Sequence, residues 1–218
     1  MADYSKLDHY SLKAQKEGYP ARSVYKLKEM DEKFGLLKSG RLPFRILDLG
    51  AVPGSWSLYV LRKLSGKSGG HADSGPSPSS SVSLVSVDLS PLSRQYDRGL
   101  FDAPDFHFIQ GDFTLPEIRE AILSRLPYRL LLSDAAPATT GNRSVDTLRS
   151  LDLAETALYY AETALAKGGS LVVKVFQGGD TGSLLKKIRG LFETGKSFKP
   201  QACRAESFET YYLGLGKK

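Results

Sequence analysis

Acidic residues stand at the ends of four predicted strands in this chain. A short apolar run leads into each of them, and the four residues are Asp48, Asp88, Asp112 and Asp134. The carboxyl ends of parallel strands meet at one edge of a sheet, and open α/β sheets bind their ligands at that edge. One acid at the end of a strand is routine, but four indicate a shared site. Carboxylates in such a site accept hydrogen bonds from ligand hydroxyl groups.

A lysine interrupts a fifth apolar run, Ser170-Leu171-Val172-Val173-Lys174-Val175-Phe176. An unpaired ammonium group in an apolar interior is costly. We therefore expect Lys174 either to reach a carboxylate or to lose its proton readily, which makes it a candidate general base. The alternative is that its side chain extends to the end of the sheet.

A turn with two glycines follows the first predicted strand, within ILDLGAVPGSW (46–56). Because they lack a Cβ atom, Gly50 and Gly54 allow the backbone to turn sharply and to approach a bound ligand. The G-x-x-x-G spacing differs from the G-x-G-x-x-G pattern of dinucleotide-binding folds. It suits a cofactor without phosphates, for which S-adenosylmethionine is the candidate. The other interpretation is a well-packed connection between a strand and a helix that begins near Ser55.

The elements that would position these residues alternate between strand and helix, which predicts an α/β fold with a mostly parallel sheet. Seven strands are expected at 45–49, 83–87, 106–109, 129–133, 170–176, 197–204 and 207–215, the last two as an antiparallel hairpin. Helices are expected at 22–34, 55–64, 114–123, 146–166 and 182–192. Lys167-Gly168-Gly169 has the composition of a helix C-terminus and would end the fourth helix.

The length of 218 residues, 41% of them hydrophobic, suits one sizeable core. We expect a basic N-terminal arm and helix at 1–44, packed on a core domain at 45–218. The Gly-, Ser- and Pro-rich stretch at 66–81 predicts a flexible insertion. No apolar run approaches the ~18 residues of a membrane span, and the N-terminus is too polar for a secretory signal. We therefore expect a cytoplasmic protein without a membrane partner.

The cysteine and histidine content argues against a metal centre. Cys203 is the single cysteine, and the three histidines are scattered without the spacing of metal ligands. We expect neither a disulfide nor a bound metal.

The net charge of +6 is concentrated at the two ends of the chain. Residues 1–45 carry ten Lys/Arg and six Asp/Glu, residues 186–218 carry eight and three, and residues 46–185 carry twelve and fifteen. If both ends pack on one side of the sheet, they form a positive surface that suits a phosphate backbone. Otherwise these side chains are ordinary solvated lysines.

With these features the chain resembles the FtsJ-type family of RNA ribose 2′-O-methyltransferases, most closely its bacterial members that modify a uridine of large-subunit (23S) ribosomal RNA. The matching segments are KAQKEGYPARSVYKLKEM (13–30), LDLGAVPGSW (47–56), VDLSP (87–91), QGDF (110–113), SDAAP (133–137), VDTLRSLDLAETAL (145–158), GGSLVVKVFQG (168–178) and CRAESFETYYLGLG (203–216). The resemblance implies a single Rossmann-like domain that binds S-adenosylmethionine, with an antiparallel C-terminal strand in a seven-stranded sheet and helices on both faces.

The resemblance also implies the site residues. The family's catalytic Lys-Asp-Lys-Glu set falls on Lys26, Asp134, Lys174 and Glu209, and its cofactor contacts fall on Gly54, Trp56, Asp88, Asp112 and Asp134. The turn after the first strand adds Asp48, Gly50 and Ser55 as cofactor-binding candidates. Ser55 replaces a second glycine of the family, and Ala135 and the Ala138-Thr139 pair also depart from its pattern. These departures affect the rim of the cofactor pocket but remove no catalytic residue type.

In the predicted mechanism, Lys174 takes the proton of the ribose 2′-hydroxyl as the general base. Asp134 would orient Lys174, while Lys26 and Glu209 would position the hydroxyl and the neighbouring lysine. We expect S-adenosylmethionine as the cofactor and ribosomal RNA, within the large subunit, as the partner of a monomeric enzyme that does not act on DNA.

Two alternatives stay open at this point. One is a 2′-O-methyltransferase that acts on transfer RNA, and the other is a non-catalytic ribosome-assembly factor with a vestigial cofactor pocket. An amino-group methyltransferase fits less well, because it would carry Asn/Asp-Pro-Pro-aromatic where this chain has Asp134-Ala135-Ala136-Pro137. A C5-pyrimidine enzyme needs a cysteine nucleophile at a position that Cys203 does not occupy. A nicotinamide dehydrogenase needs a different glycine spacing.

Overall fold

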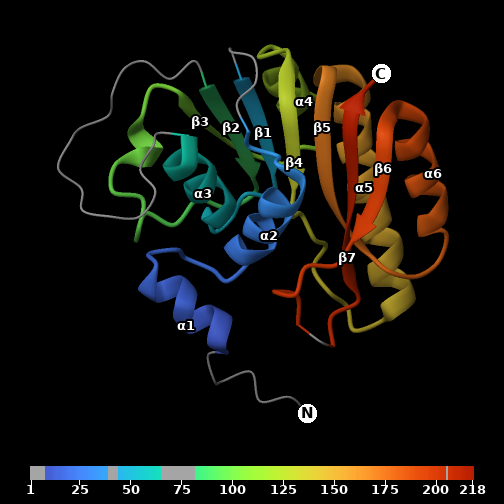
Figure 1. Ribbon diagram of the computed structural model, residues 1–218, viewed down its shortest axis with the longest axis horizontal. Helices are drawn as coiled ribbons and strands as arrows, with labels where there is room; N and C mark the ends of the chain where they lie inside the picture. Colours follow the sequence, from blue (N-terminus) through green and yellow to red (C-terminus); the bar gives the residue numbers. More distant parts are fainter. Residues whose placement is uncertain (1–7, 39–43, 65–81, 205) are drawn as a thin grey trace.

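Residues 8–38, 44–64, 82–204 and 206–218 are described by a computed structural model, in which seven strands form one sheet (Figure 1). The strands are β1 (Phe44–Leu49), β2 (Val82–Asp88), β3 (Phe106–Gln110), β4 (Tyr128–Ser133), β5 (Leu165–Phe176), β6 (Phe192–Phe198) and β7 (Glu209–Lys217). Their order is β3-β2-β1-β4-β5-β7-β6. The first five are parallel, and β7 is antiparallel to both of its neighbours. The predicted mostly parallel sheet with an antiparallel C-terminal strand is confirmed.

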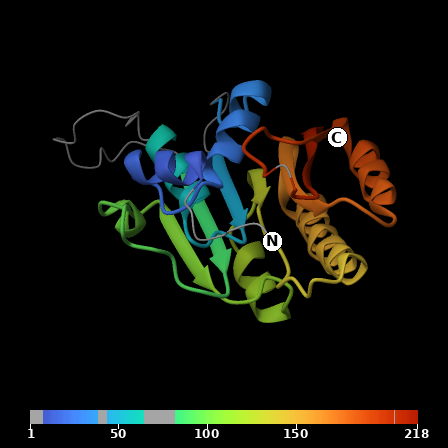
Figure 2. The same cartoon turned by 90° about the horizontal axis from the view of Figure 1, so that it is seen from below.

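Helices cover both faces of the sheet (Figure 2). They are α1 (His9–Lys16), α2 (Val24–Phe34), α3 (Ser55–Leu64), α4 (Pro116–Leu123), α5 (Arg143–Ala164) and α6 (Thr181–Leu191), with a short 3-10 helix, η1, at Leu100–Asp102. Alternate residues of a strand point to opposite faces. Ile46 and Leu130 therefore pack with residues of α2 and α3 in one core cluster, while Leu47 and Leu131 pack with residues of α4, α5 and α6 in the other.

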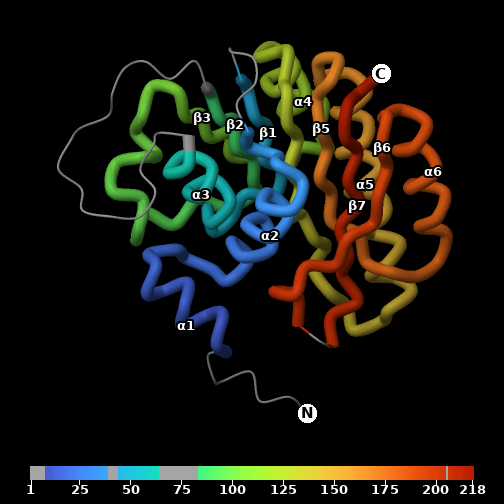
Figure 3. Tube along the Cα trace, viewed as in Figure 1, coloured from blue at the N-terminus to red at the C-terminus, as the bar shows by residue number. Residues whose placement is uncertain are grey.

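The segments near the two ends of the chain lie side by side (Figures 1 and 3). The carboxylate of Glu29 in α2 accepts hydrogen bonds from the backbone N–H groups of Gln201 and Ala202, at 2.6 and 2.8 Å. The rings of Phe34 and Phe198 meet edge to face with centroids 5.5 Å apart. Because α2 is thereby fixed to the loop between β6 and β7, the basic residues of both segments share one side of the molecule.

The predicted end of the fourth helix was wrong. Helix α5 ends at Ala164, and Lys167-Gly168-Gly169 lies within β5. Leu165 already pairs with Tyr128 of β4, and the next pair joins Ser170 to Leu130, so the glycines accommodate a shift in register. Gly168 has φ of +74°, a backbone conformation that suits glycine in a bulge as well as at a helix end.

The predicted start of the sixth strand was also wrong, because β6 begins at Phe192 and ends at Phe198. Phe192 is fully buried, and its ring occupies the space above Gly214 of β7, where an added Cβ would lie 2.3 Å away. This contact between distant residues sets where the strand begins. The predicted insertion at 66–81 and residues 1–7 of the predicted arm lie outside the described residues.

Replacing Gly50 by alanine should destabilise the protein more than the same change at Gly99. Backbone φ is +74° at Gly50 and +79° at Gly99, and such a conformation costs alanine about 1–2 kcal/mol. A Cβ at Gly50 would also lie 2.6 Å from the Cα of Ala135, whereas nothing lies within 4 Å at Gly99. The overlap should add about 1–3 kcal/mol. Urea titration of both variants measures the difference in unfolding free energy, and equal costs would contradict the prediction.

Candidate active site

Two buried ion pairs meet at the carboxyl edge of the sheet. The ammonium group of Lys26 lies 2.8 Å from both carboxylate oxygens of Glu209. The ammonium group of Lys174 lies 3.0 Å from Oδ1 of Asp134 and also donates to the main-chain oxygen of Asp134. The four side chains are between 8% and 16% exposed. The structure therefore brings the four residues of the predicted catalytic set together.

Four separate segments supply these residues. Asp134 follows the last residue of β4, and Lys26 lies in the first turn of α2. Lys174 of β5 pairs with Tyr211 of β7, and two residues further along, Phe176 pairs with Glu209. Side chains two residues apart point to the same face of a strand. The antiparallel pairing thus places Glu209 and Lys174 on the face of the sheet that α2 covers.

Tyr211, which was not predicted from the sequence, joins the two ion pairs. Its hydroxyl group donates to Oδ1 of Asp134 at 2.7 Å, and the ammonium group of Lys26 lies 5.9 Å from the centroid of its ring. Burial and the carboxylates of Asp134 and Glu209 raise the pKa of Tyr211 well above its ordinary value, so the phenol keeps its proton. The alternation of a strand was the available signal, since Tyr211 lies two residues after Glu209.

The electrostatics fix the charge of two members of the cluster. Burial opposes the charge of Lys26, but the carboxylates of Asp134 and Glu209 outweigh it and raise the pKa of Lys26. Burial would raise the pKa of Asp134, but the ammonium groups of Lys174 and Lys26 and the hydroxyl of Tyr211 lower it below its ordinary value. At neutral pH, Lys26 is therefore a cation and Asp134 an anion.

Asp48 lies fully buried beneath this cluster. Its Oδ2 accepts a 2.7 Å hydrogen bond from the hydroxyl of Ser57, and its Oδ1 has no partner among the described residues. Burial raises the pKa of Asp48 to about 7; the hydrogen bond from Ser57 opposes this, and the carboxylates of Asp134 and Asp88 add to it. A buried oxygen without a partner is rare, and it marks a place for a donor that the protein does not supply.

The other two predicted acids shape the loops after their strands. Asp88 accepts from the backbone N–H groups of Val52, at 2.9 Å, and Ser90, at 3.1 Å. Asp112 accepts from the backbone N–H and the hydroxyl of Thr114 through Oδ1. Because β3, β2, β1 and β4 are neighbours in this order, the four acids line one edge of the sheet as the sequence predicted.

The turn after β1 is packed against other protein segments. Gly50 abuts Ala135 of the loop after β4, and Gly54, with φ of +107°, faces the ring of Phe101. The hydroxyl of Ser55 accepts from the backbone N–H of Ala21 at 2.8 Å and donates to its carbonyl at 3.1 Å. Ser55 therefore fixes the segment before α2.

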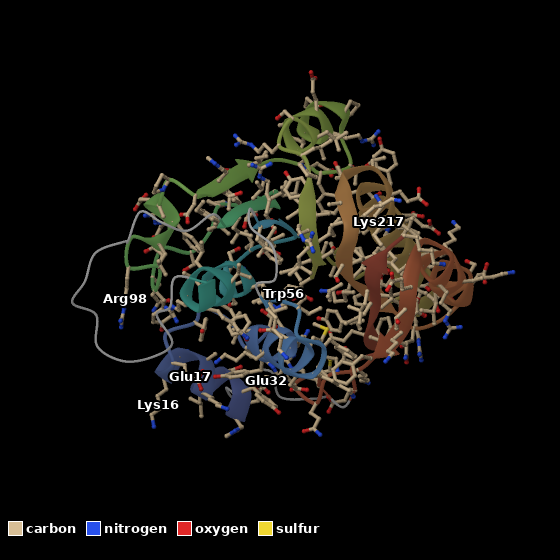
Figure 4. All side chains as sticks on the ribbon, turned by 45° about the horizontal axis from the view of Figure 1, so that its top comes forward. Lys16, Glu17, Glu32, Trp56, Arg98 and Lys217 are labelled. Atoms are coloured by element: carbon tan, nitrogen blue, oxygen red, sulfur yellow. The ribbon has the colours of Figure 1, made fainter. Side chains whose placement is uncertain are left out.

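Trp56 belongs to the interior of the molecule, whereas Lys16 of α1 points into solvent (Figure 4). Trp56 is 2% exposed, and its indole N–H donates to the carbonyl of Ser23 at 2.8 Å. Its ring lies 5.9 Å from that of Tyr211. The polar side-chain groups of Ser55 and Trp56 are thus engaged within the protein, and any cofactor contact at these positions falls to the backbone.

Two grooves flank α2. The mouth groove, about 460 Å³, opens beside the ion pairs and is lined by Ala21, Arg22, Ser23, Lys26, Ala202, Arg204, Glu206, Ser207, Phe208 and Glu209. The lysine groove, about 860 Å³, lies between α1, α2 and the loop after β6 and is lined by Tyr10, Lys13, Tyr25, Lys28, Glu29, Glu32, Lys33, Phe198, Lys199 and Gln201. Both grooves are built from the basic segments near the two ends of the chain.

Among the described residues, no helix is long and apolar enough to cross a membrane, and no group of three His, Cys, Asp or Glu side chains could hold a metal ion. Burial and the neighbouring Glu209 raise the pKa of Cys203 to about 12, so that this residue is a neutral thiol rather than a nucleophilic thiolate.

The sequence model of the FtsJ-like methyltransferases matches residues 19–217. The chain belongs to this family. Ribosomal RNA large subunit methyltransferase E of Treponema denticola is 48% identical to it over 216 residues, which cover 99% of this chain and 97% of that protein. The protein of the same name from Oleidesulfovibrio alaskensis is 43% identical, with 97% and 92% covered. The family predicted from the motifs is confirmed, and the chain is a methyltransferase.

A solved structure agrees with this membership. The crystal structure from Plasmodium falciparum that is described as a ribosomal RNA methyltransferase matches with a TM-score of 0.69 at 25% identity. The match covers 91% of this chain and 98% of that chain. The Rossmann-like architecture predicted for the chain is confirmed.

The titration of Asp48 should make stability fall as pH rises. The folded protein keeps the Asp48 proton up to about pH 7, whereas the unfolded chain releases it near the ordinary value of 3.8. The contribution of Asp48 to the free energy of unfolding is therefore full below pH 3.8. It falls by up to about 1.4 kcal/mol per pH unit until the pH passes 7. Asp48→Asn, which cannot titrate, should lack this component. Urea unfolding of both proteins at pH 5 and 7.5 tests it, and identical pH dependence would contradict it.

Proposed function

We propose that this chain transfers the methyl group of S-adenosylmethionine to the ribose 2′-oxygen of a uridine in the 23S RNA of the large ribosomal subunit. The observation that carries the proposal is the meeting of Lys26, Asp134, Lys174 and Glu209 at one point of the sheet edge. Relatives that are 43% and 48% identical bear the name Ribosomal RNA large subunit methyltransferase E, which supports this choice of RNA.

The residues at the carboxyl ends of β1, β2 and β3 fit the cofactor. The unpartnered Oδ1 of Asp48 suits an ammonium group such as that of the methionine moiety. Asp88 and Asp112 would accept hydrogen bonds from hydroxyl or amino groups, Gly50 and Gly54 would shape the turn, and the backbone at Ser55 and Trp56 would complete the site. When bound, S-adenosylmethionine supplies a methyl group that its sulfonium has already activated.

Lys174 is the general base in this proposal. In its ion pair with Asp134, Lys174 is an ammonium group, which has no lone pair. To act as the base it first releases one proton to solvent, and the neutral amine then has two N–H groups and one lone pair. These two N–H groups can donate to the two oxygens of Asp134 that the amine contacts, the main-chain oxygen and Oδ1. The lone pair is then left for the proton of the 2′-hydroxyl. Once Lys174 holds this proton, the ionised carboxylate of Asp134 stabilises its charge.

Lys26 has a different chemical role from Lys174 in this proposal. Its raised pKa keeps it protonated, so it cannot accept a proton at neutral pH. We propose that it donates a hydrogen bond to the 2′-oxygen and stabilises the negative charge that develops as the proton leaves. Glu209 holds Lys26 through both of its oxygens, and Tyr211 holds Asp134.

The substrate must be RNA, since DNA offers no 2′-hydroxyl. We propose that the lysine groove binds the sugar-phosphate backbone next to the target. Lysine ammonium groups cover the aromatic rings of this groove, at 4.8 and 5.0 Å from the centroid of Tyr25 and 4.3 Å from that of Phe198. These rings therefore present ammonium groups to phosphates and leave less of their faces for stacked bases.

Labelled methyl transfer to large ribosomal subunits, free ribosomal RNA and transfer RNA distinguishes the proposal from its alternatives. We expect label in the large-subunit RNA, at a ribose 2′-oxygen of a uridine. Label in transfer RNA alone would favour the second enzyme hypothesis, and RNA binding without any transfer would favour a ribosome-assembly factor. A factor of that kind has no need for the buried amine of Lys174.

Replacing Lys174 by alanine should reduce the rate of methyl transfer by at least about 100-fold, because the proton of the 2′-hydroxyl loses its acceptor. Binding of S-adenosylmethionine, measured by calorimetry, should be unchanged. Lys187→Ala is the matched control, since Lys187 forms an exposed ion pair with Glu155. Turnover of Lys174→Ala at the wild-type rate would refute the assignment of the base.

Replacing Lys33 by alanine should make RNA binding less sensitive to salt. Lys33 is exposed in the lysine groove, and the loss of one phosphate contact should reduce the slope of log Kd against log salt concentration by about 0.7. The exposed Lys186 of α6, which packs on the other face of the sheet, provides the control variant Lys186→Ala. If both variants keep the wild-type slope, Lys33 does not contact a phosphate.

A further inference from the structure

One aromatic ring faces the mouth groove beside the ion pairs. Of the residues that line this groove, Phe208 alone has an aromatic side chain, and it directly precedes Glu209, which holds Lys26. In a nucleotide, the base is attached to the carbon next to the one that carries the 2′-oxygen. A 2′-oxygen held between Lys26 and Lys174 would therefore keep the base within reach of the mouth groove, which Lys26 lines.

Two segments, the end of β5 and the start of α5, fix the position of Phe208. Its main-chain oxygen accepts a 2.8 Å hydrogen bond from the backbone N–H of Gln177, just after β5. Its ring centroid lies 4.6 Å from that of Phe176, and the guanidinium of Arg143, the first residue of α5, lies 5.2 Å from it. A ring held from several sides loses little conformational entropy when a ligand stacks on it.

We propose that Phe208 is the platform on which the base of the target nucleotide stacks, and that Arg143 secures the platform and binds the adjacent phosphate. The inference rests on the proposed function. Stacking of a base on an aromatic ring tolerates any base, and a guanidinium can bind a phosphate while it contacts a ring. The ring of Tyr25 in the lysine groove is less suited, since two ammonium groups lie over it, whereas one guanidinium lies over Phe208.

Variants of Phe208 separate stacking from packing. Phe208→Ala should weaken the binding of RNA about 5- to 150-fold, the range for loss of one stacked base, with unchanged affinity for S-adenosylmethionine. Phe208→Trp and Phe208→Tyr should retain most of the affinity. Phe208→Leu keeps apolar contact with Phe176 but lacks an aromatic face, so it should behave like the alanine variant. Full affinity in Phe208→Leu would overturn the proposal.

The chain offers a matched control on the other face of the sheet. Tyr159 of α5 is 38% exposed and has the guanidinium of Arg119 at 5.0 Å from its ring centroid, the same kind of pair. Tyr159→Ala should bind RNA like the wild type. An equal loss of affinity in Tyr159→Ala and Phe208→Ala would mean that the effect is not specific to the mouth groove, and the platform would be rejected.

An RNA without a base at the modified nucleotide completes the experiment. The wild type should bind the abasic RNA as weakly as Phe208→Ala binds the intact RNA, and Phe208→Ala should lose nothing further on the abasic RNA. If Phe208→Ala weakens both RNAs equally, it acts through Glu209 and not through the base, which overturns the platform. Methyl transfer by the wild type is scored separately, so failure of the proposed function is distinguishable from failure of the platform.

Discussion

The burial of two ammonium groups and two carboxylates at one point constrains the rest of the structure. Each ion pair is almost completely removed from water, and loss of one partner would leave an uncompensated charge at a cost of about 3–5 kcal/mol. Well-packed apolar residues would serve stability equally well. The four charged residues are therefore better explained by a chemical role than by stability. The sheet, α2 and the loop before β7 bring them together.

The antiparallel direction of β7 follows from this constraint. Asp134 follows the C-terminal end of a parallel strand, and Lys174 lies near the end of another. Glu209 is the first residue of β7, so only a strand that runs the opposite way brings it to the same edge. The same reversal aligns Tyr211 with Lys174, and the hydroxyl of Tyr211 then reaches Asp134. Figure 1 shows α2 and the loop before β7 together at this edge.

Local patterns in the sequence predicted much of this arrangement, and contacts between distant segments decided the rest. The apolar runs and the acids that follow them located the parallel strands. Lys167-Gly168-Gly169 has the composition of a helix end. It lies within β5 because Leu165 before it and Ser170 after it both pair with β4. Gly50 was predicted to admit a ligand, yet the structure places Ala135 against it. The bond from Tyr211 to Asp134 depends on strand register, which no local pattern specifies.

The protonation states of Lys26 and Lys174 test most directly whether the two lysines divide the chemistry between them. Lysine side chains labelled with ¹³C next to the amine would be followed by NMR as pH changes, with Lys26→Arg and Lys174→Arg to assign the signals, beside the pH dependence of single-turnover methyl transfer. We predict that the rise in rate with pH disappears in Lys174→Arg, while the Lys26 signal stays that of an ammonium group throughout. A rate that follows Lys26, or that rises with pH unchanged in Lys174→Arg, would contradict the proposed centre.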